Sequence, residues 1–196
     1  MVIEIAKCLG KQLHGRVQGK THFAEVCRRL ASVSSGEVVL LDFRGVDLVT
    51  GSWINAMIVP LFRWACAEQT DLFPLLANVR EDWLDELELV AEWNHQCYLV
   101  CKGGQSSPRR ATLVGKLDPA QESTLRAVLK YCPVTGAELE RQWTGDRVKA
   151  TAWNNRLRDL HAKRLVRREK KGREQIYSPV VKEITCDGRQ LPATAG

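Results

Sequence analysis

The sequence predicts two domains of different classes, an α/β domain over residues 1–110 and an α+β domain over residues 111–196. In the first half, apolar runs of strand length alternate with segments whose apolar residues recur at helical spacing, which is typical of a sheet with helices packed against it. In the second half, signals for three helices precede two short strands around a glycine. A chain of 196 residues is long enough for two small cores.

The elements of the first half follow from the period of the apolar residues. Residues 37–43 (EVVLLDF) form a nearly continuous apolar run, which favours a strand that is buried on both faces. Residues 111–117 (ATLVGKL) could be the last strand of the first domain or the first strand of the second. The other elements expected in this half are strands at residues 2–6, 73–79 and 97–102, and helices at residues 22–31, 52–68 and 81–93.

Two capping signals begin the second half. Asp118-Pro-Ala-Gln121 places a hydrogen-bond acceptor before a helix, a proline at its first position and a glutamine where a capping box needs one. Thr135-Gly-Ala-Glu138 is a second capping box of the same kind. Because a turn signal follows at residues 144–145 (TG), the second helix must be short.

A third, longer helix should follow that turn. Over residues 146–164 the apolar residues recur at helical spacing, and the opposite side of the helix is polar. Two short helices, a turn and a longer helix with a polar face make a helix-turn-helix. Residues 165–178 contain two short strand patterns around Gly172, which indicates a β-hairpin. The tail after Glu183 is expected to be frayed.

The net charge of +6 is unevenly distributed along the chain. Residues 1–101 carry nine Lys and Arg against thirteen Asp and Glu, whereas residues 102–196 carry twenty against ten. A polyanionic partner would therefore bind the second half. No apolar run approaches the ~18 residues that a membrane span needs, and Glu4 interrupts the N-terminal segment where a secretory signal would be apolar. We expect a cytosolic protein with no membrane partner.

The segment from Leu41 to Ile54 (LDFRGVDLVTGSWI) resembles the centre of STAS-type domains, the family of the anti-sigma factor antagonists, and within it a bacterial STAS-like group. The resemblance implies an α/β regulatory domain. It also implies that Ser52, at the start of a helix, is phosphorylated by a kinase of the histidine-kinase-ATPase type, and a helix N-terminus favours a phosphate. Thr50 and Trp53 depart from the acidic residue and the glycine that are usual in the family. Ser52 could instead act only as the N-cap of that helix.

The stretch LHAKRLVRREKKGREQIYSP, residues 160–179, resembles the winged helices of bacterial MarR-type and ArsR-type transcriptional regulators. In those families a recognition helix is followed by a leucine-valine-arginine strand and a glycine turn. The resemblance implies a winged helix-turn-helix domain with the hairpin as its wing. Arg164 stands where these families commonly have glycine before the strand, a difference that matters only if φ is positive there.

Seven residues are candidates for contact with duplex DNA. The helical ones should face the major groove, where Arg pairs with guanine and Asn with adenine, and the hairpin ones should reach phosphates or the minor groove. They are Arg147, Thr151, Asn155 and Arg158 on the third helix, and Lys170, Lys171 and Arg173 on the hairpin. The alternative is an ordinary solvated basic face. Only Asp159 and Glu169 interrupt the basic residues, which favours nucleic-acid binding.

Motifs for catalysis or for cofactor binding are not found. The chain has no Gly-rich phosphate loop, no H-E-x-x-H and no G-x-S-x-G, so we expect neither an enzyme nor a cofactor. Cys97 and Cys101 beside His95 could bind a metal, but their spacing fits two buried strand cysteines better, and we expect no metal. The seven cysteines have no regular spacing that would suggest disulfides. His161 is expected to pack in the core.

Two functions are consistent with these patterns. The first is a bacterial transcription regulator whose winged helix binds duplex DNA, as a homodimer on a two-fold site, and whose STAS-like domain receives a signal or binds a partner. The second is a partner-switching adaptor, in which the STAS-like domain binds a histidine-kinase-type ATPase and the winged helix docks a protein.

Overall fold

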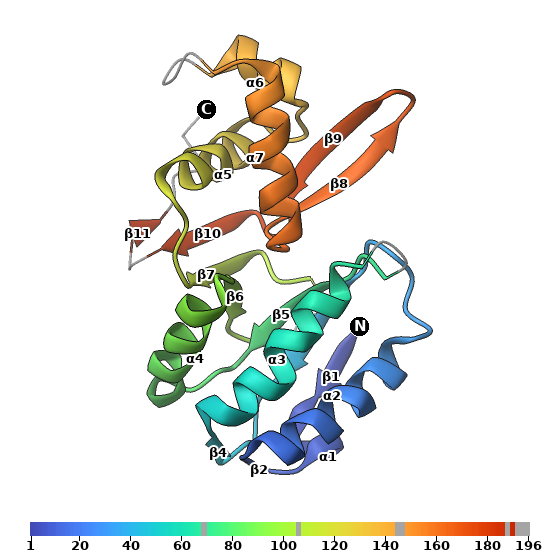
Figure 1. Cartoon of the computed structure of the whole chain (residues 1–196), viewed down its shortest axis with the longest axis vertical. Helices are drawn as coiled ribbons and strands as arrows, with labels where there is room; N and C mark the ends of the chain where they lie inside the picture. Colours follow the sequence, from blue (N-terminus) through green and yellow to red (C-terminus); the bar gives the residue numbers. More distant parts are fainter. Residues whose placement is uncertain (68–69, 105–106, 144–147, 187–188, 191–196) are drawn as a thin grey trace.

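The computed structural model describes residues 1–67, 70–104, 107–143, 148–186 and 189–190. These residues form a mixed α/β structure around a seven-stranded, mostly parallel sheet in the order β1-β3-β5-β6-β7-β10-β11 (Figure 1). The strands of this sheet are β1 (Val2–Glu4), β3 (Val38–Asp42), β5 (Phe73–Ala77), β6 (Tyr98–Cys101), β7 (Arg110–Val114), β10 (Glu183–Cys186) and β11 (Arg189–Gln190). Two further sheets have two strands each, β2 (Gln12–Leu13) with β4 (Leu48–Val49), and β8 (Val166–Lys171) with β9 (Glu174–Pro179).

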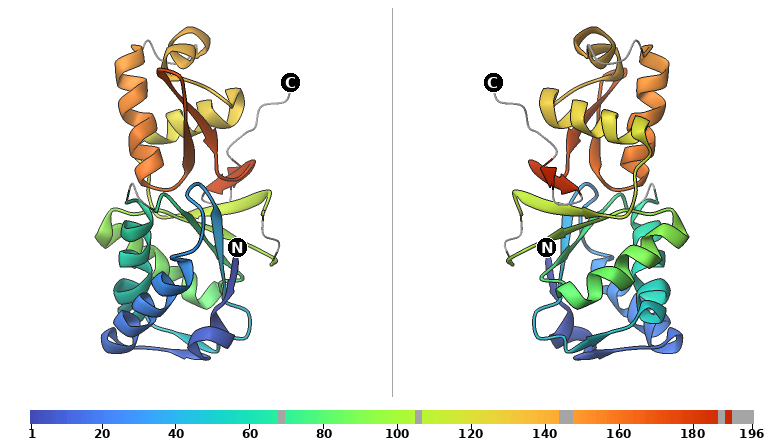
Figure 2. Two further views of the ribbon diagram at one scale, coloured as in Figure 1. Left: turned by 90° about the vertical axis from the view of Figure 1, so that its right-hand side faces the viewer. Right: turned by 90° about the vertical axis from the view of Figure 1, so that its left-hand side faces the viewer.

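The described residues include seven helices, none with the length and apolarity to cross a membrane. The helices are α1 (Ile5–Leu9), α2 (Arg16–Leu30), α3 (Gly51–Ala65), α4 (Glu81–Asn94), α5 (Pro119–Tyr131), α6 (Gly136–Gln142) and α7 (Ala150–Ala162). The α2–α4 helices lie on one side of the large sheet, while α5–α7 and the β8–β9 hairpin lie on the other (Figure 2).

Both faces of the centre of the large sheet, at β3 and β5, are buried, as the apolar run at residues 37–43 predicts for β3. The β3 strand is buried at all five positions, and so is β5. Alternate side chains such as Val39 and Leu41 pack in the core with α2–α4. The intervening Val38 and Leu40 pack in a second core that includes Leu125 and other residues of the second half. The second half therefore supplies the layer that the first half lacks.

The large sheet continues across the predicted boundary at residue 110. The β7 strand pairs antiparallel with β6, and β10 pairs in parallel with β7, with Ile184 opposite Ala111. Residues 111–117 thus begin with a strand shared by both halves. The expectation of a frayed tail after Glu183 is wrong for residues 184–186 and 189–190, because Ile184 is fully buried in the second core and β10 and β11 extend the sheet. Residues 191–196 lie outside the described residues.

The two capping boxes expected in the second half are confirmed, whereas the third helix begins at Ala150 and not near residue 146. The Asp118 carboxylate accepts a hydrogen bond from the Gln121 backbone N–H at 2.8 Å, and the Thr135 hydroxyl accepts one from the Glu138 backbone N–H at 3.2 Å. Both reciprocal side-chain bonds are present. In the first half, α2 begins at Arg16, six residues before its expected start.

Arg164 occupies a position that does require positive φ. Its φ is 60°, a conformation that costs an arginine about 1 kcal/mol or more relative to a glycine. Its side chain is only 3% exposed and crosses to the first half, where Nη1 lies 2.6 Å from an Asp71 carboxylate oxygen and Nε lies 3.1 Å from the Cys66 sulfur. The guanidinium also stacks over Phe73. These contacts offset the backbone strain and hold the C-terminal end of α7 against the α/β half.

Removing the Asp71 carboxylate should leave the Arg164 guanidinium buried without its counter-ion. We expect Asp71→Ala to lower the free energy of unfolding by about 3 kcal/mol, the usual cost of breaking a buried pair. Urea denaturation would measure the change, with Asp85→Ala, which removes an exposed carboxylate on α4, as the control. Equal stability of the two variants would contradict the role of this contact.

A second buried carboxylate fixes the loops at the carboxyl ends of β3 and β5. Asp42 is 1% exposed and accepts hydrogen bonds from Asn78 Nδ2 at 2.7 Å and from Arg44 Nη2 at 2.7 Å. Burial acts to raise the pKa of Asp42, but the bonds from Arg44 and Asn78 outweigh it and hold the pKa below its ordinary value. The amide of Asn78 in turn binds the backbone of Gly103.

The lowered pKa of Asp42 predicts the direction in which the stability of the protein changes with pH. The unfolded carboxyl has a pKa of about 3.9, so the stability that Asp42 contributes is present above that pH and is lost as the pH falls through the lower folded pKa. We expect the wild type to be more stable than Asp42→Asn near neutral pH, with the difference shrinking in acid. Denaturant melts across pH would measure this, with Asp47→Asn as an exposed control. A difference that is constant with pH would contradict it.

Candidate nucleic-acid interface

The third helix of the second half divides into a buried face and an exposed face. Trp153, Leu157 and Leu160 recur at helical spacing and are fully buried. Three of the DNA-contact candidates lie on the exposed side, namely Thr151, Asn155 and Arg158. Arg158 Nη2 donates a hydrogen bond to Asn155 Oδ1 at 2.5 Å, so these two side chains are held together. The fourth candidate, Arg147, lies outside the described residues.

The hairpin separates two candidates that the sequence grouped together. Successive side chains of a strand point to opposite faces, so Lys170 and Lys171 cannot share one. Lys170 lies on the same hairpin face as Arg168 and pairs across the strands with Gln175, whereas Lys171 lies on the other face and pairs with Glu174. Gly172 has a φ of 63° at the first central position of the turn, as a type II′ hairpin requires. The exposed Arg173 stands beside it at the tip.

Tyr177 joins the exposed face of α7 to one face of the hairpin. It is buried, and its backbone exchanges two hydrogen bonds with Val134, at 2.8 and 2.9 Å, which fastens β9 to the segment between α5 and α6. Burial raises the pKa of the Tyr177 hydroxyl, and the positive charges of Arg168 and Arg158 act to lower it. Arg168 lies directly across the strands from Tyr177, and Tyr177 packs in the same core as Leu157 and Leu160 of α7, so this hairpin face adjoins α7.

The resulting surface, which we call the basic face, consists of Thr151, Asn155 and Arg158 on α7 with Arg168 and Lys170 on β8. Sequence reasoning missed Arg168. The alternation of Val166, Arg168 and Lys170 could have identified it, since a buried valine fixes which strand positions look toward α7. Among the described residues, Asp159 lies on the side of α7 that lines a hollow with Lys163 and residues of the α/β half, and Glu169 lies on the opposite face of the hairpin with Lys171.

In the part of the chain that the structure describes, the hydrogen bonds that join α7 to the α/β half lie at the C-terminal end of the helix. The Ala162 carbonyl accepts a bond from the Cys66 thiol at 2.9 Å, and Lys163 donates to the His95 carbonyl at 2.8 Å. The buried His161 bonds the Val166 carbonyl and lies 3.2 Å from Asp71, and burial, aided by the charge of Arg164, lowers its pKa. The hairpin tip points away from the α/β half (Figure 1). Asn155 and Arg158 therefore remain accessible.

The interpretation of Ser52 as the N-cap of α3 is wrong. The cap is Thr50, whose hydroxyl accepts from the Trp53 backbone N–H at 3.4 Å, and Ser52 lies exposed in the first helical turn. The Ser52 hydroxyl lies 3.1 Å from that of Thr50. The Glu86 carboxylate of α4 lies so close to Gly51 that a Cβ there would clash with it. A phosphate on Ser52 would therefore meet a negative charge already present at this helix end.

The cysteines considered as metal ligands lie in the sheet. Cys97 and Cys101 are buried, and burial raises the pKa of each thiol to about 11, which disfavours the thiolate that a metal needs. His95 is exposed and ends α4 in a left-handed conformation. The described residues contain no group of three or more His, Cys, Asp or Glu side chains placed to hold a metal ion.

The chain was compared with models of known protein families, with curated proteins and with solved structures. None of the three comparisons finds a match.

Proposed function

We propose that the chain is a transcription regulator that binds duplex DNA through a winged helix-turn-helix formed by α5 to β9, and that its α/β half is a STAS-like regulatory domain. The order of elements supports this assignment: α5, the Val134 bridge, the short α6, the longer α7 and the β8–β9 hairpin. Two copies would bind a two-fold site, as is common for this class of protein.

The continuity of the basic face around Tyr177 is the observation that carries the proposal. A helix that lies in the major groove presents side chains to base edges, where Arg158 suits guanine and Asn155 suits adenine. A neighbouring hairpin that carries Arg168 and Lys170 on the same side would meet the phosphate backbone. Arg173 at the tip would reach the phosphates or the minor groove beyond them. Lys171 points elsewhere and should contribute less.

Salt titration against duplex DNA tests the basic face. Each lost phosphate contact should reduce the slope of log affinity against log salt by about 0.9. We expect the double variant Arg168→Ala, Lys170→Ala to lose close to two such contacts on every sequence, and Asn155→Ala to change sequence preference instead. Lys171→Ala is the matched control on the opposite hairpin face. Equal losses from Lys170→Ala and Lys171→Ala would contradict the assigned face, and no binding at low salt would contradict the function.

Exposed apolar residues on α4 favour partner switching as a second function. Leu89 and Trp93 are 50% and 79% exposed and lie one turn apart on the helix whose Glu86 approaches the N-terminus of α3. An exposed tryptophan beside a leucine is typical of a protein-binding surface. Ser52 lies at that neighbouring helix end, accessible to a kinase.

Phosphorylation and binding by a purified histidine-kinase-type ATPase would test this second function. We expect the ATPase to phosphorylate the wild type but not Ser52→Ala, and we expect Trp93→Ser to weaken the complex about tenfold or more, as hot-spot tryptophans do. Val17→Ser, which changes an equally exposed apolar residue on α2, is the control. Unchanged binding by Trp93→Ser would rule out this surface.

A further inference from the structure

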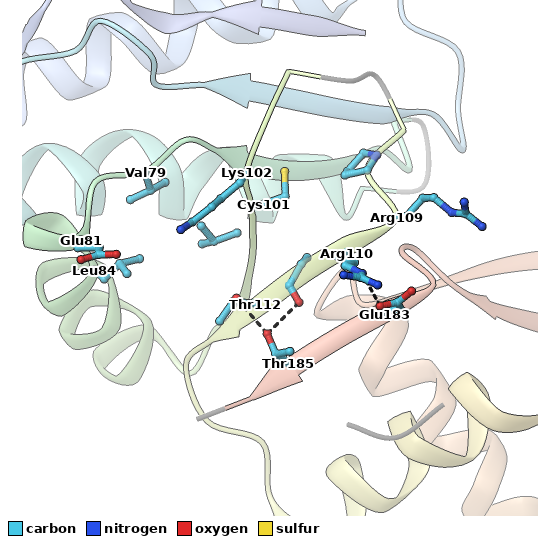
Figure 3. Close-up of a pocket in the computed structure, with 13 residues that line it drawn as sticks. Val79, Glu81, Leu84, Cys101, Lys102, Arg109, Arg110, Thr112, Glu183 and Thr185 are labelled. Carbon is cyan, nitrogen blue, oxygen red and sulfur yellow. Dashed lines mark hydrogen bonds and ion pairs between the residues drawn. The ribbon is translucent and has the colours of Figure 1, made fainter. Parts of the chain in front are cut away.

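An open hollow of about 1050 Å³ lies over the part of the large sheet that α4 leaves uncovered (Figure 3). Its floor is formed by Val100, Thr112 and Thr185, which lie opposite one another on the adjacent strands β6, β7 and β10. The two threonine hydroxyls are 3.0 Å apart. Glu81 and Leu84 in the first turn of α4 line one side, and Lys102, Pro108 and Arg109 line the other. A hollow of this size can hold a small organic ligand.

Two opposite charges line the hollow without a partner. Lys102 extends into it toward the side where Glu81 and Leu84 of α4 lie, while Arg109 points away (Figure 3). Among the residues that the structure describes, neither Lys102 nor Glu81 has a hydrogen-bond or ion-pair partner. Arg110 and Glu183, which also line the hollow, neutralise each other at 2.6 Å. The hollow thus offers one free ammonium and one free carboxylate.

The apolar residues that line the hollow further restrict which ligands it can bind. Val79, Leu84 and Val100 offer aliphatic surface next to the two charges. None of the described residues around the hollow is aromatic, so a nucleobase would find no stacking partner. A simple anion could pair with Lys102 but would be repelled by Glu81. A simple cation could pair with Glu81 but would be repelled by Lys102.

We propose that this hollow binds a small zwitterion with an aliphatic body, of which a free aliphatic α-amino acid is the simplest. Its carboxylate pairs with Lys102, its ammonium pairs with Glu81 and donates hydrogen bonds to the threonine oxygens, and its side chain packs on Val79, Leu84 and Val100.

The hollow is connected to the basic face through the chain itself, so its ligand regulates DNA binding. This regulatory part rests on the proposed function. The β10 strand, which carries Thr185 and Glu183, begins four residues after the hairpin strand β9 ends at Pro179. In the connection, the Val180 N–H bonds the Leu165 carbonyl at the start of the hairpin, and the Glu183 N–H bonds the Arg109 carbonyl at the hollow. A ligand that shifts β10 therefore acts on the base of the hairpin.

Ligand binding can be tested on the full chain without DNA. Backbone amide spectra would be followed during titration with L-leucine, with isovalerate, which lacks the ammonium, and with isopentylamine, which lacks the carboxylate. We expect saturable shifts at Val100, Thr112 and Thr185 with leucine, and affinity about tenfold or more lower for each single-charge analogue. No saturable shifts, or equal binding of the three probes, would overturn the proposal.

Substitutions of Lys102 and Glu81 test whether these two side chains bind the ligand. Lys102→Gln and Glu81→Gln should each weaken leucine binding about tenfold or more, whereas Lys182→Gln and Glu88→Gln, which change exposed residues outside the hollow, should not. The amide spectrum of each variant shows whether it is folded, and the analogue titrations need no variant. Leucine binding that survives both Lys102→Gln and Glu81→Gln would place the ligand elsewhere.

The regulatory part has a separate readout. We expect leucine to change the dissociation constant for duplex DNA about fivefold or more, within the usual range of allosteric coupling. Leucine binding with no change in DNA affinity would remove the regulation and keep the ligand site. A chain that binds leucine but no DNA at any salt concentration would contradict the proposed function alone.

Discussion

The burial of both faces of the large sheet at its central strands, β3 and β5, is the constraint on which the rest of the structure depends. Every residue of β3 and β5 is buried, and all of them except Asp42 are apolar. Each fully buried Leu or Val contributes about 1.5–3 kcal/mol to the free energy of folding. The α2–α4 helices can cover only one face. The other face is covered by α5, α7 and the base of the hairpin, so the second half folds onto the first as a layer of the same structure.

This packing determines which parts of the second half remain free. Ile184 draws β10 onto β7, and Arg164 reaches Asp71 at the end of α7, so the C-terminal end of the helix and the base of the hairpin are both held. The exposed side of α7 and the distal hairpin point away from these contacts. The basic face exists because the anchors lie at one end of each element and the polar residues lie beyond them. The same β10 strand contributes Thr185 to the floor of the hollow, which places the proposed ligand site and the proposed DNA-contact surface on either side of one connection.

Local signals in the sequence predicted local structure well. The two capping boxes need only residues three positions apart, and both are present at Asp118 and Thr135. The apolar run at residues 37–43 correctly indicated burial on both faces, although what covers the second face could not be assigned from it. The choice between Thr50 and Ser52 as N-cap depends on where α3 begins, and a two-residue difference is beyond what propensity can resolve.

Features that depend on distant partners were missed. The pairing of β10 with β7 joins residues more than seventy positions apart. The short β10 sequence therefore cannot be recognised as a strand without knowledge of its partner. Arg164 looked like a mild departure from glycine, because its positive φ and its partner Asp71 are visible only in three dimensions. The separation of Lys170 from Lys171 follows from the alternation of side chains along a strand, whereas the face that adjoins the core is identified by the burial of Val166 and Tyr177, which only the structure shows.

Lysine acetylation footprinting in the presence of saturating duplex DNA tests the central claim most directly, because it compares neighbouring side chains in one unmodified protein. The basic face predicts strong protection of Lys170, weaker protection of Lys171, and none of Lys20 on α2 or Lys130 on α5. Protection of Lys20 or Lys130 equal to that of Lys170 would contradict the claim that α7 and one face of the hairpin form the nucleic-acid surface.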